Sequence, residues 1–232
     1  MARSARQPEG AGRGRATPGM SGAARADAEP AALVRDAAAL GVGLDATAVA
    51  RLLQLLDELQ HWNRAYNLTA LTGRRAMVTH HLLDSLSAAP LLAGTRVADV
   101  GTGAGFPGLP LAVACPGRHF TLIDSNGKKI RFVAHAVRAL GLKNVTAVHQ
   151  RAEQHGGPYE CVIARAYAAL PELLASVQGL CGPATRVIAM KGRLPAAEIA
   201  ALPQGWRLLD ARRVEVPGLA AERHLLTIAR TG

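Results

Sequence analysis

A glycine-rich run after an apolar segment constrains the fold of this chain most strongly. Arg96 to Val100 has the pattern of a buried strand, and four of the eight residues from Gly101 to Gly108 are glycine. Glycine accepts a positive φ and lets a ligand approach the backbone closely, while a following helix directs its free N–H groups at that ligand. The run therefore predicts the turn from a first parallel strand into a helix, at the ligand-binding edge of an α/β sheet.

A carboxylate follows this run at an informative distance. The segment His119 to Asp124 is the predicted second strand, and Asp124 ends it 21 residues after Gly103. At this spacing a carboxylate accepts hydrogen bonds from both ribose hydroxyls of an adenosine. Together the two features predict an adenosine-containing cofactor bound by Gly101, Gly103, Gly105 and Asp124.

The remainder of the chain fits a parallel sheet that helices cover on both faces. From Arg96 onward, short β-rich runs alternate with helical stretches. The predicted strands are 96–100, 119–124, 145–149, 161–164, 185–190, 206–216 and 223–229, and the predicted helices are about 107–115, 127–140, 169–180 and 195–202. No obvious helix separates the last two strands, which predicts an antiparallel pair at the end of the sheet.

Two segments precede the predicted sheet. Residues 1–30 contain no Leu, Ile, Val or aromatic residue, so we expect a disordered tail that cannot offset the entropy of ordering. Residues 31–92 have helical periodicity, with Asp45 as a candidate N-cap, and predict a small helical cap. Residues 93–232 form the expected Rossmann-like domain.

Charge and cysteine content limit the environment and the partners. The chain has 27 Lys and Arg against 17 Asp and Glu, a formal net charge of +10, which favours a polyanion such as nucleic acid as partner. Three cysteines without C-x-x-C spacing indicate a reducing compartment and argue against a disulfide framework or a thiolate metal site. No long uncharged apolar run is present, which argues against a membrane span. We expect a cytoplasmic monomer that binds no metal.

The identity of the cofactor depends on the details of the loop. Gly103-x-Gly105-x-x-Gly108 also fits the dinucleotide pattern, which keeps an NAD(P)-dependent oxidoreductase as an alternative. However, Asp99 stands two positions before the first glycine, as is typical of class I methyltransferases, and no Tyr-x-x-x-Lys pair occurs. Gly127-Lys128 lacks the remaining residues of a phosphate-binding P-loop. These observations favour S-adenosyl-L-methionine, and a non-catalytic RNA-binding assembly factor remains a second alternative.

The sequence contains no motif typical of methyl transfer to an exocyclic amine or to carbon. The Asn/Asp-Pro-Pro-aromatic turn common in exocyclic amine methylation is missing, and Cys161 lies within a predicted strand, where a core role is favoured. A ring nitrogen such as guanine N7 has a free lone pair and needs no deprotonation before attack. The sequence is consistent with that acceptor.

Several motifs occur in a fixed order between about Leu44 and Ala229. The motifs are Trp62-Asn63-x-x-Tyr66-Asn67-Leu68-Thr69, His81-Leu82-Leu83-Asp84-Ser85, Asp99-Val100-Gly101-Thr102-Gly103-Ala104-Gly105-Phe106-Pro107-Gly108, Leu122-Ile123-Asp124-Ser125-x-x-Lys128-Lys129, Arg165-Ala166-Tyr167-Ala168-Ala169-Leu170, Met190-Lys191-Gly192 and Glu222-Arg223-His224-Leu225. With this set of motifs the chain resembles the small-subunit ribosomal RNA methyltransferase G family, also called glucose-inhibited division protein B.

The resemblance implies a function and a set of cofactor-binding residues. It implies a class I S-adenosylmethionine-dependent fold with a seven-stranded, mostly parallel sheet, and methylation of N7 of guanine 527 in 16S rRNA. Gly101 and Phe106 would contact the cofactor from the loop, and Asp124 would bind its ribose. Ala152 and Glu153 would flank the adenine. The partner would be 16S rRNA or the small ribosomal subunit.

Further residues are candidates for the target side of the site. The resemblance implies that Arg165 contacts both cofactor and target, and its forked guanidinium suits a phosphate or a guanine edge. His81, Asp84 and Ser85 are spaced to share one helical face and could cover the target base, which makes His81 and Asp84 catalytic candidates beside Arg165. The candidate RNA-binding residues are Asn63, Arg64, Asn67, Lys128, Lys129 and Lys191.

Overall fold

Seven strands form one sheet, in the order β3-β2-β1-β4-β5-β7-β6. The computed structural model describes residues 22–231, with side chains from residue 28 onward. β1 to β5 run parallel, whereas β7 is antiparallel to both β5 and β6. The α/β class, the seven strands and the antiparallel end are therefore confirmed. The strands are β1 (Arg96–Val100), β2 (His119–Asp124), β3 (Val145–His149), β4 (Tyr159–Arg165), β5 (Cys181–Lys191), β6 (Trp206–Arg213) and β7 (His224–Arg230).

The strand order reverses between β1 and β4. β1 pairs with β2 on one side and with β4 on the other, and the connections from these two strands leave toward opposite faces of the sheet. At such a switch point the loops after the carboxyl ends diverge and leave a crevice in which open α/β sheets bind ligands. The glycine loop after β1 lies at this crevice.

The predicted helices of the sheet domain are present, with ends that differ by a few residues. Asn126 caps α6, where its side-chain oxygen accepts hydrogen bonds from the backbone N–H groups of Lys128 and Lys129. Pro171 occupies the first turn of α7, where a missing N–H has no cost. The helices are α5 (Gly108–Ala114), α6 (Gly127–Ala139), α7 (Leu170–Ser176) and α8 (Ala196–Ala200), with short 3₁₀ turns η3 (Ala152–Gln154) and η4 (Gln178–Leu180).

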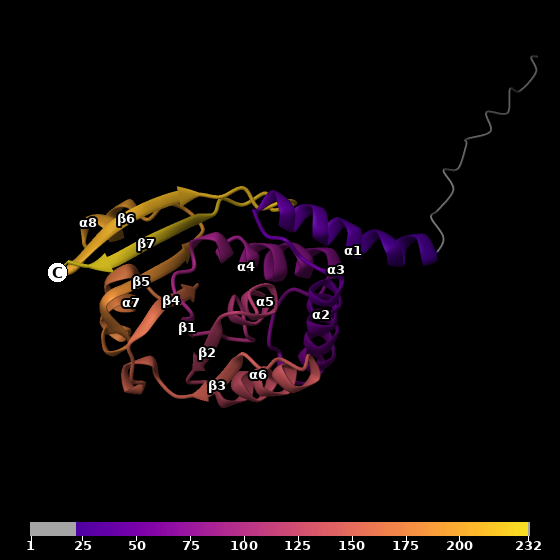
Figure 1. Ribbon diagram of the computed structural model, residues 1–232, viewed down its shortest axis with the longest axis horizontal. Coiled ribbons are helices and arrows are strands. Elements are labelled where there is room, and N and C mark those ends of the chain that lie inside the picture. Colours follow the sequence, from indigo (N-terminus) through magenta and orange to yellow (C-terminus); the bar gives the residue numbers. More distant parts are fainter. Residues whose placement is uncertain (1–21, 232) are drawn as a thin grey trace, which may run out of the picture.

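Helices precede the sheet, as the periodicity predicts. Asp45 caps α2 (Ala46–Tyr66) by accepting a hydrogen bond from the N–H of Ala48. A second helical segment joins α3 (Arg74–Met77), the π-helical turn η1 (Val78–Leu83) and α4 (Asp84–Leu86), and the short η2 (Ala89–Leu91) follows. Figure 1 shows α2 and α4 on the side of the sheet that carries α5 and α6.

The first helix corrects the expectation for the start of the chain. α1 spans Gly22–Ala39, so residues 22–30, predicted as part of a disordered tail, are helical in the structure. The prediction weighed the missing large apolar residues, but alanine has the highest helix propensity, and Leu33 of the same helix is fully buried. Glu29 also forms an ion pair with Arg74 at 2.9 Å. The tail prediction for residues 1–21 lies outside the described residues.

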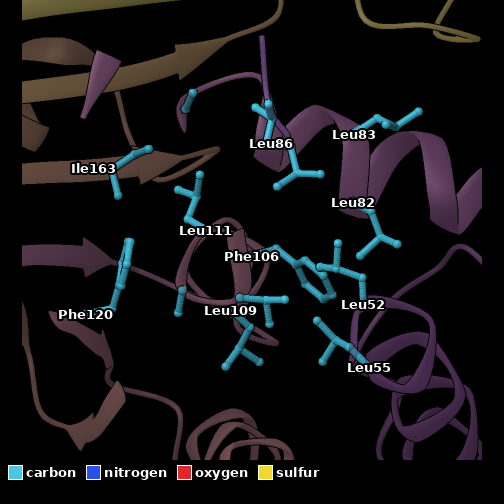
Figure 2. Packing of buried hydrophobic residues seen from close by; sticks show 14 of the residues in the cluster. Leu52, Leu55, Leu82, Leu83, Leu86, Phe106, Leu109, Leu111, Phe120 and Ile163 are labelled. Atoms are coloured by element: carbon cyan, nitrogen blue, oxygen red, sulfur yellow. The ribbon is translucent and has the colours of Figure 1, made fainter. Parts of the chain in front are cut away.

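Each face of the sheet packs into its own apolar cluster. Side chains alternate along β1, so that Val97 belongs to the cluster under the N-terminal helices and Ala98 and Val100 to the cluster under α7. Figure 2 shows the first cluster, where Leu52 and Leu55 of α2 and Leu82 of η1 lie close to Phe106 and Leu109. The N-terminal helices thus share one core with the glycine loop, which fixes their position over it.

Among residues 22–231, no helix is long and apolar enough to cross a membrane. In the same range, no group of three or more His, Cys, Asp or Glu side chains is arranged to hold a metal ion. Cys115, Cys161 and Cys181 are all free thiols.

Candidate active site

The glycine loop is held in a conformation that other residues adopt poorly. Gly101, Gly103 and Gly105 have φ values of 65°, 62° and 86°, in the left-handed region that strains residues with a Cβ. At Gly101 a Cβ would overlap the ring of Tyr167, and at Gly105 it would overlap the side chain of Leu109. Gly101 therefore permits a close approach at the crevice, while Gly105 permits packing of the loop against α5.

Asp99 of β1 connects the two ends of this loop through hydrogen bonds. Its Oδ2 accepts hydrogen bonds from the Thr102 hydroxyl at 2.5 Å and from the Gly108 N–H at 2.8 Å. The side chain is fully buried, its Oδ1 has no hydrogen-bond partner among residues 22–231, and burial raises the pKa of the carboxyl to about 6. Asp99, the acid that precedes the first glycine, therefore stabilises the conformation of the loop in this chain.

Asp124 connects the end of β2 to the glycine loop. Its Oδ2 accepts a hydrogen bond from the Gly103 N–H at 2.8 Å, and its Oδ1 accepts one from the Asn126 N–H at 2.7 Å. A carboxylate offers about four lone-pair sites, so each oxygen retains capacity for one more donor. The backbone bonds orient this carboxylate before any ligand binds.

A cavity of about 270 Å³, called here the small cavity, lies at the ends of β1, β2 and β4. Ala152 and Glu153 of η3 contribute to its wall, with Ala152 buried and Glu153 exposed. The structure thus brings together Gly101, Asp124, Ala152 and Glu153, which the sequence analysis assigned to one cofactor. The full lining is Val100, Gly101, Ile123, Asp124, Ser125, Lys129, Gln150, Arg151, Ala152, Glu153, Ala166 and Tyr167.

A second cavity of about 500 Å³, called here the large cavity, adjoins the small one. Gly101, Lys129 and Ala166 line both cavities, so a ligand in the small cavity would extend past Gly101 into the large one. Within the described chain Lys129 forms no ion pair. The large cavity is lined by Leu68, Thr69, Leu71, His80, His81, Asp84, Gly101, Thr102, Gly103, Ala104, Phe106, Lys129, Arg165, Ala166, Met190, Lys191, Gly192 and Arg223.

Two arginines, Arg165 at the end of β4 and Arg223 just before β7, hold Asp84 at the large cavity. Its Oδ2 lies 2.9 Å from a terminal nitrogen of Arg165, and its Oδ1 lies 2.6 Å from Nε of Arg223. The Asp84 side chain is only 1% exposed, so the carboxylate depends on these partners for compensation of its charge. The same nitrogen of Arg165 also donates to the carbonyl of His80 at 2.8 Å.

Arg223 was not among the predicted site residues, although it stands in one of the motifs. It lies on the loop that leads into β7, 139 residues from Asp84. The available signal was its position in Glu222-Arg223-His224-Leu225. Its role becomes visible only once β7 is placed beside β5.

His81 is a neutral, stacked imidazole in this site. Its Nε2 lies 3.0 Å from the Thr69 hydroxyl, and its ring stacks on Phe106 with centroids 4.7 Å apart. Burial, and secondarily the charge of Arg165, lower the pKa of His81 to about 4. Nδ1 has no hydrogen-bond partner in the described part of the chain. His81 is therefore unprotonated near neutral pH.

The helix that carries His81 departs from the expected α-helical spacing. The N–H of Asp84 donates to the carbonyl of Thr79, five residues earlier, instead of four. Such π turns occur often at functional sites. His81 and Asp84 both line the large cavity, whereas Ser85 is buried and donates its hydroxyl to the His81 carbonyl. The prediction that Ser85 faces the same pocket is wrong, because its side chain is buried and its hydroxyl bonds within its own helix.

The six candidate RNA-binding residues lie in different environments. Asn63 is engaged inside the chain, since its amide exchanges hydrogen bonds with the backbone N–H and carbonyl of Thr69 at 2.8 and 2.9 Å. Lys191 donates to Glu198 and to the carbonyl of Ala168, both at 2.8 Å. The other four are exposed or half-buried at the ends of α2 and α6, and these are Arg64, Asn67, Lys128 and Lys129.

Solved structures share this architecture at low sequence identity. The chain is similar to magnesium protoporphyrin IX methyltransferase from Synechocystis with bound SAM, with a TM-score of 0.55 and 17% identity, over 82% of this chain and 99% of that one. It is also similar to a SAM-dependent methyltransferase from Aquifex aeolicus, with a TM-score of 0.50 and 20% identity, over 66% of this chain and 93% of that one. The fold is that of S-adenosylmethionine-dependent methyltransferases.

Sequence relatives are much closer in identity. The ribosomal RNA small subunit methyltransferase G of Stenotrophomonas maltophilia is 48% identical over 189 residues, which are 81% of this chain and 89% of that protein. The protein of the same name from Marinobacter nauticus is 45% identical over 195 residues, or 83% and 91% of the two chains. Residues 48–226 match the family described as "rRNA small subunit methyltransferase G". On this match and these identities, the chain belongs to the rRNA small subunit methyltransferase G family.

Proposed function

We propose that this chain transfers a methyl group from S-adenosyl-L-methionine to N7 of a guanine in 16S rRNA. Family membership supports the RNA substrate and the methyl transfer, and the resemblance described above implies guanine 527 as the position. The products are then 7-methylguanosine and S-adenosyl-L-homocysteine. The observation that carries the proposal is the junction of the two cavities at Gly101, where a donor in the small cavity meets an acceptor in the large one.

The small cavity fits an adenosine-containing donor. Asp124 retains acceptor capacity for the ribose hydroxyls, and we assign Ala152 and Glu153, which line the same cavity, to the adenine. The missing Cβ of Gly101 leaves room for the Tyr167 ring, and both residues line this cavity. Lys129, which lines both cavities, is the cation we assign to the carboxylate of the methionyl part. The bound donor supplies an already activated methyl group, so the residues of this chain mainly supply alignment.

The large cavity fits an acceptor that needs no proton removed. The Asp84 carboxylate is held by two guanidinium groups, and the pKa of His81 is about 4. Neither acid–base candidate from the sequence analysis is thus suited to deprotonate a substrate near neutral pH. Guanine N7 attacks with a free lone pair, so this environment favours it over an exocyclic amine.

Arg165 is the group we assign to the target base. Asp84 and the His80 carbonyl fix one terminal nitrogen, and the guanidinium lies over the Phe106 ring at 5.8 Å. The remaining N–H groups suit O6 of a guanine or a phosphate oxygen. His81 and Phe106 form a stacked wall beside it. In this assignment Arg165 orients the target, and Asp84 orients Arg165.

The two other candidate functions fit less well. The hypothesis of a nicotinamide-dependent oxidoreductase is no longer supported, because both the family and the fold are those of methyltransferases. A non-catalytic RNA-binding factor would need no aligned junction between two cavities. The experiment below separates it from an enzyme.

The test is transfer of tritium from methyl-labelled S-adenosylmethionine to small ribosomal subunits that lack the modification. We expect label in 16S rRNA that nuclease digestion recovers as 7-methylguanosine. Arg165→Ala should abolish at least about 99% of kcat/KM, since an orienting charged group is lost. Arg186→Ala, an exposed arginine on β5, is the matched control and should retain activity. No label with the wild-type chain, or label on another atom, contradicts the proposal in whole or in its N7 part.

A further inference from the structure

A third cavity, called here the cap cavity, lies in the N-terminal helices and has a volume of about 490 Å³. Leu71 lines both the cap cavity and the large cavity, so the segment between α2 and α3 is a wall common to the two. The proposed methyl transfer leaves this cavity unassigned. It is lined by Gln60, Asn63, Arg64, Asn67, Leu71, Thr72 and Met77.

Four of the five polar residues that line the cap cavity come from the end of α2, and the fifth, Thr72, comes from the loop after it. Gln60, Asn63 and Arg64 share one face of the last two turns of α2 at spacings of three and four residues, and Asn67 is the C-cap of this helix. Met77, which is buried, and the half-buried Leu71 provide apolar surface opposite them. Amide and guanidinium groups around an apolar surface suit a flat aromatic group with hydrogen-bonding edges.

Part of this polar set is fixed and part is free. The two hydrogen bonds between Asn63 and the Thr69 backbone hold its amide in one orientation, and one N–H of that amide remains available. Gln60 donates only a long bond of 3.4 Å to the Thr72 carbonyl. Across residues 28–231, neither Arg64 nor Asn67 makes a side-chain hydrogen bond or an ion pair, and no carboxylate is part of the lining.

Two carboxylates of the N-terminal helices, Glu29 and Asp57, pair with Arg74 and not with Arg64. Arg74 engages Glu29 at 2.9 Å and Asp57 at 2.6 Å. The cap cavity therefore keeps an unpaired positive charge beside amides that pair well with base edges. This combination matches a nucleotide, with its anionic phosphate and its polar base edge.

From this we infer that the cap cavity binds a second nucleotide of the same RNA, adjacent in sequence to the methylated guanine. The inference rests on the proposed function, which places the target base in the large cavity. The wall at Leu71 then separates two neighbouring extruded bases. Single-stranded RNA is recognised in this way, by bases that are unstacked and bound individually. Arg64 and Asn67 bind the flanking nucleotide, while Asn63 positions the wall through Thr69.

The test combines a variant with RNA that lacks single bases. Arg64→Met with Asn67→Gly removes both free polar groups, and glycine keeps the left-handed backbone that Asn67 adopts, with φ of 49°. Small subunits are reconstituted with 16S rRNA that carries one abasic nucleotide, at each of three positions on either side of the methylated guanine. Arg138→Met on the exposed face of α6 is the matched charge control.

The inference predicts coupling at one position. The wild-type chain should lose about tenfold in kcat/KM when one flanking base is missing. The double variant should lose a similar factor with intact RNA and nothing further at that abasic position, while Arg138→Met behaves as wild type. Unchanged binding of S-adenosylhomocysteine by the variant checks its folding.

Other outcomes overturn the inference and are distinct from failure of the proposed function. If the double variant has the same fold loss in kcat/KM relative to wild type on intact RNA and on every abasic RNA, Arg64 and Asn67 contact a phosphate alone. Wild-type rates on every abasic RNA exclude a bound flanking base. If the wild-type chain fails to methylate intact particles, the proposed function itself fails, and this inference fails with it.

Discussion

The carboxylate of Asp84 and the guanidinium of Arg165 lie 2.9 Å apart, although 81 residues separate them in the chain. Asp84 begins α4 in the N-terminal helices, and Arg165 ends β4 of the sheet. The pair therefore joins the helical segment to the switch point of the sheet. Arg165, which we propose contacts the target, and Asp84, which holds Arg165, thus come from the two parts of the molecule.

Removal of the Asp84 carboxylate should destabilise the chain strongly. Asp84→Ala leaves Arg165 and Arg223 partly buried without their counter-charge, and such a loss costs about 3–5 kcal/mol of unfolding free energy. Asp57→Ala is the matched control, because this aspartate also pairs with an arginine but is 66% exposed. Its loss should cost no more than about 1 kcal/mol. Denaturant unfolding measures both, and equal small losses would show that the buried network contributes little.

Gly101 should be sensitive to substitution for a reason specific to the crevice. Gly101→Ala forces a Cβ into the Tyr167 ring and should weaken binding of S-adenosylhomocysteine at least tenfold. Gly141→Ala is the control, since it has a similar φ of 62° but no atom within 4 Å of an added Cβ. Both variants carry backbone strain of about 1–2 kcal/mol. The account is contradicted if the two weaken ligand binding equally.

Asp124 should contribute directly to cofactor affinity. Asp124→Ala removes the charge-assisted hydrogen bonds to the ribose and the support of the Gly103 N–H. A loss of about 1.5–3 kcal/mol is expected, or roughly 10- to 150-fold in Kd. Titration calorimetry with S-adenosylhomocysteine measures it, and NADH should give no heat with either protein. Unchanged affinity in the variant removes Asp124 from the site.

His81 should make folding stability depend on pH in one direction. Its pKa is lowered from 6.5 to about 4, first by burial and then by Arg165, so the unfolded chain binds a proton in this window that the folded chain does not. The stability is fully present above pH 6.5 and decreases as the pH falls toward 4, on the order of 3 kcal/mol in total.

The variant His81→Asn isolates this contribution. Between pH 7.5 and 4.5 the wild-type chain should lose about 2–3 kcal/mol more unfolding free energy than the variant. His61→Asn, on the exposed side of α2, controls for the loss of an imidazole. Parallel pH curves for wild type and His81→Asn would show that His81 is not held neutral by its burial.

The sheet and the cofactor side of the site were predictable because their signals are local. The bounds of β1, β2 and β3 match the predicted ranges, since apolar runs and flanking turns are read within a few residues. The glycine loop and Asp124 lie within 24 residues of each other, and strand pairing brings them together at the carboxyl edge. Local patterns are also why Asp45 was identified as a cap.

The target side was less predictable because its contacts depend on tertiary packing. Periodicity groups Ser85 with His81 and Asp84, whereas in the structure Ser85 is buried and its hydroxyl donates to the His81 carbonyl. The partnership of Asp84 with Arg223 spans 139 residues and requires the antiparallel placement of β7. Asn63 is a candidate RNA-binding residue from its motif alone, whereas its hydrogen bonds to Thr69 depend on the path of the next loop.

The central claim is that the crevice at the ends of β1, β2 and β4 binds S-adenosylmethionine with its methyl group directed into the large cavity. A crystal structure of the complex with S-adenosylhomocysteine tests it most directly. The account predicts the ribose hydroxyls on Asp124, the adenine beside Ala152, and the sulfur next to Gly101. A ligand bound elsewhere, or a crevice that stays empty at saturating ligand, would contradict it.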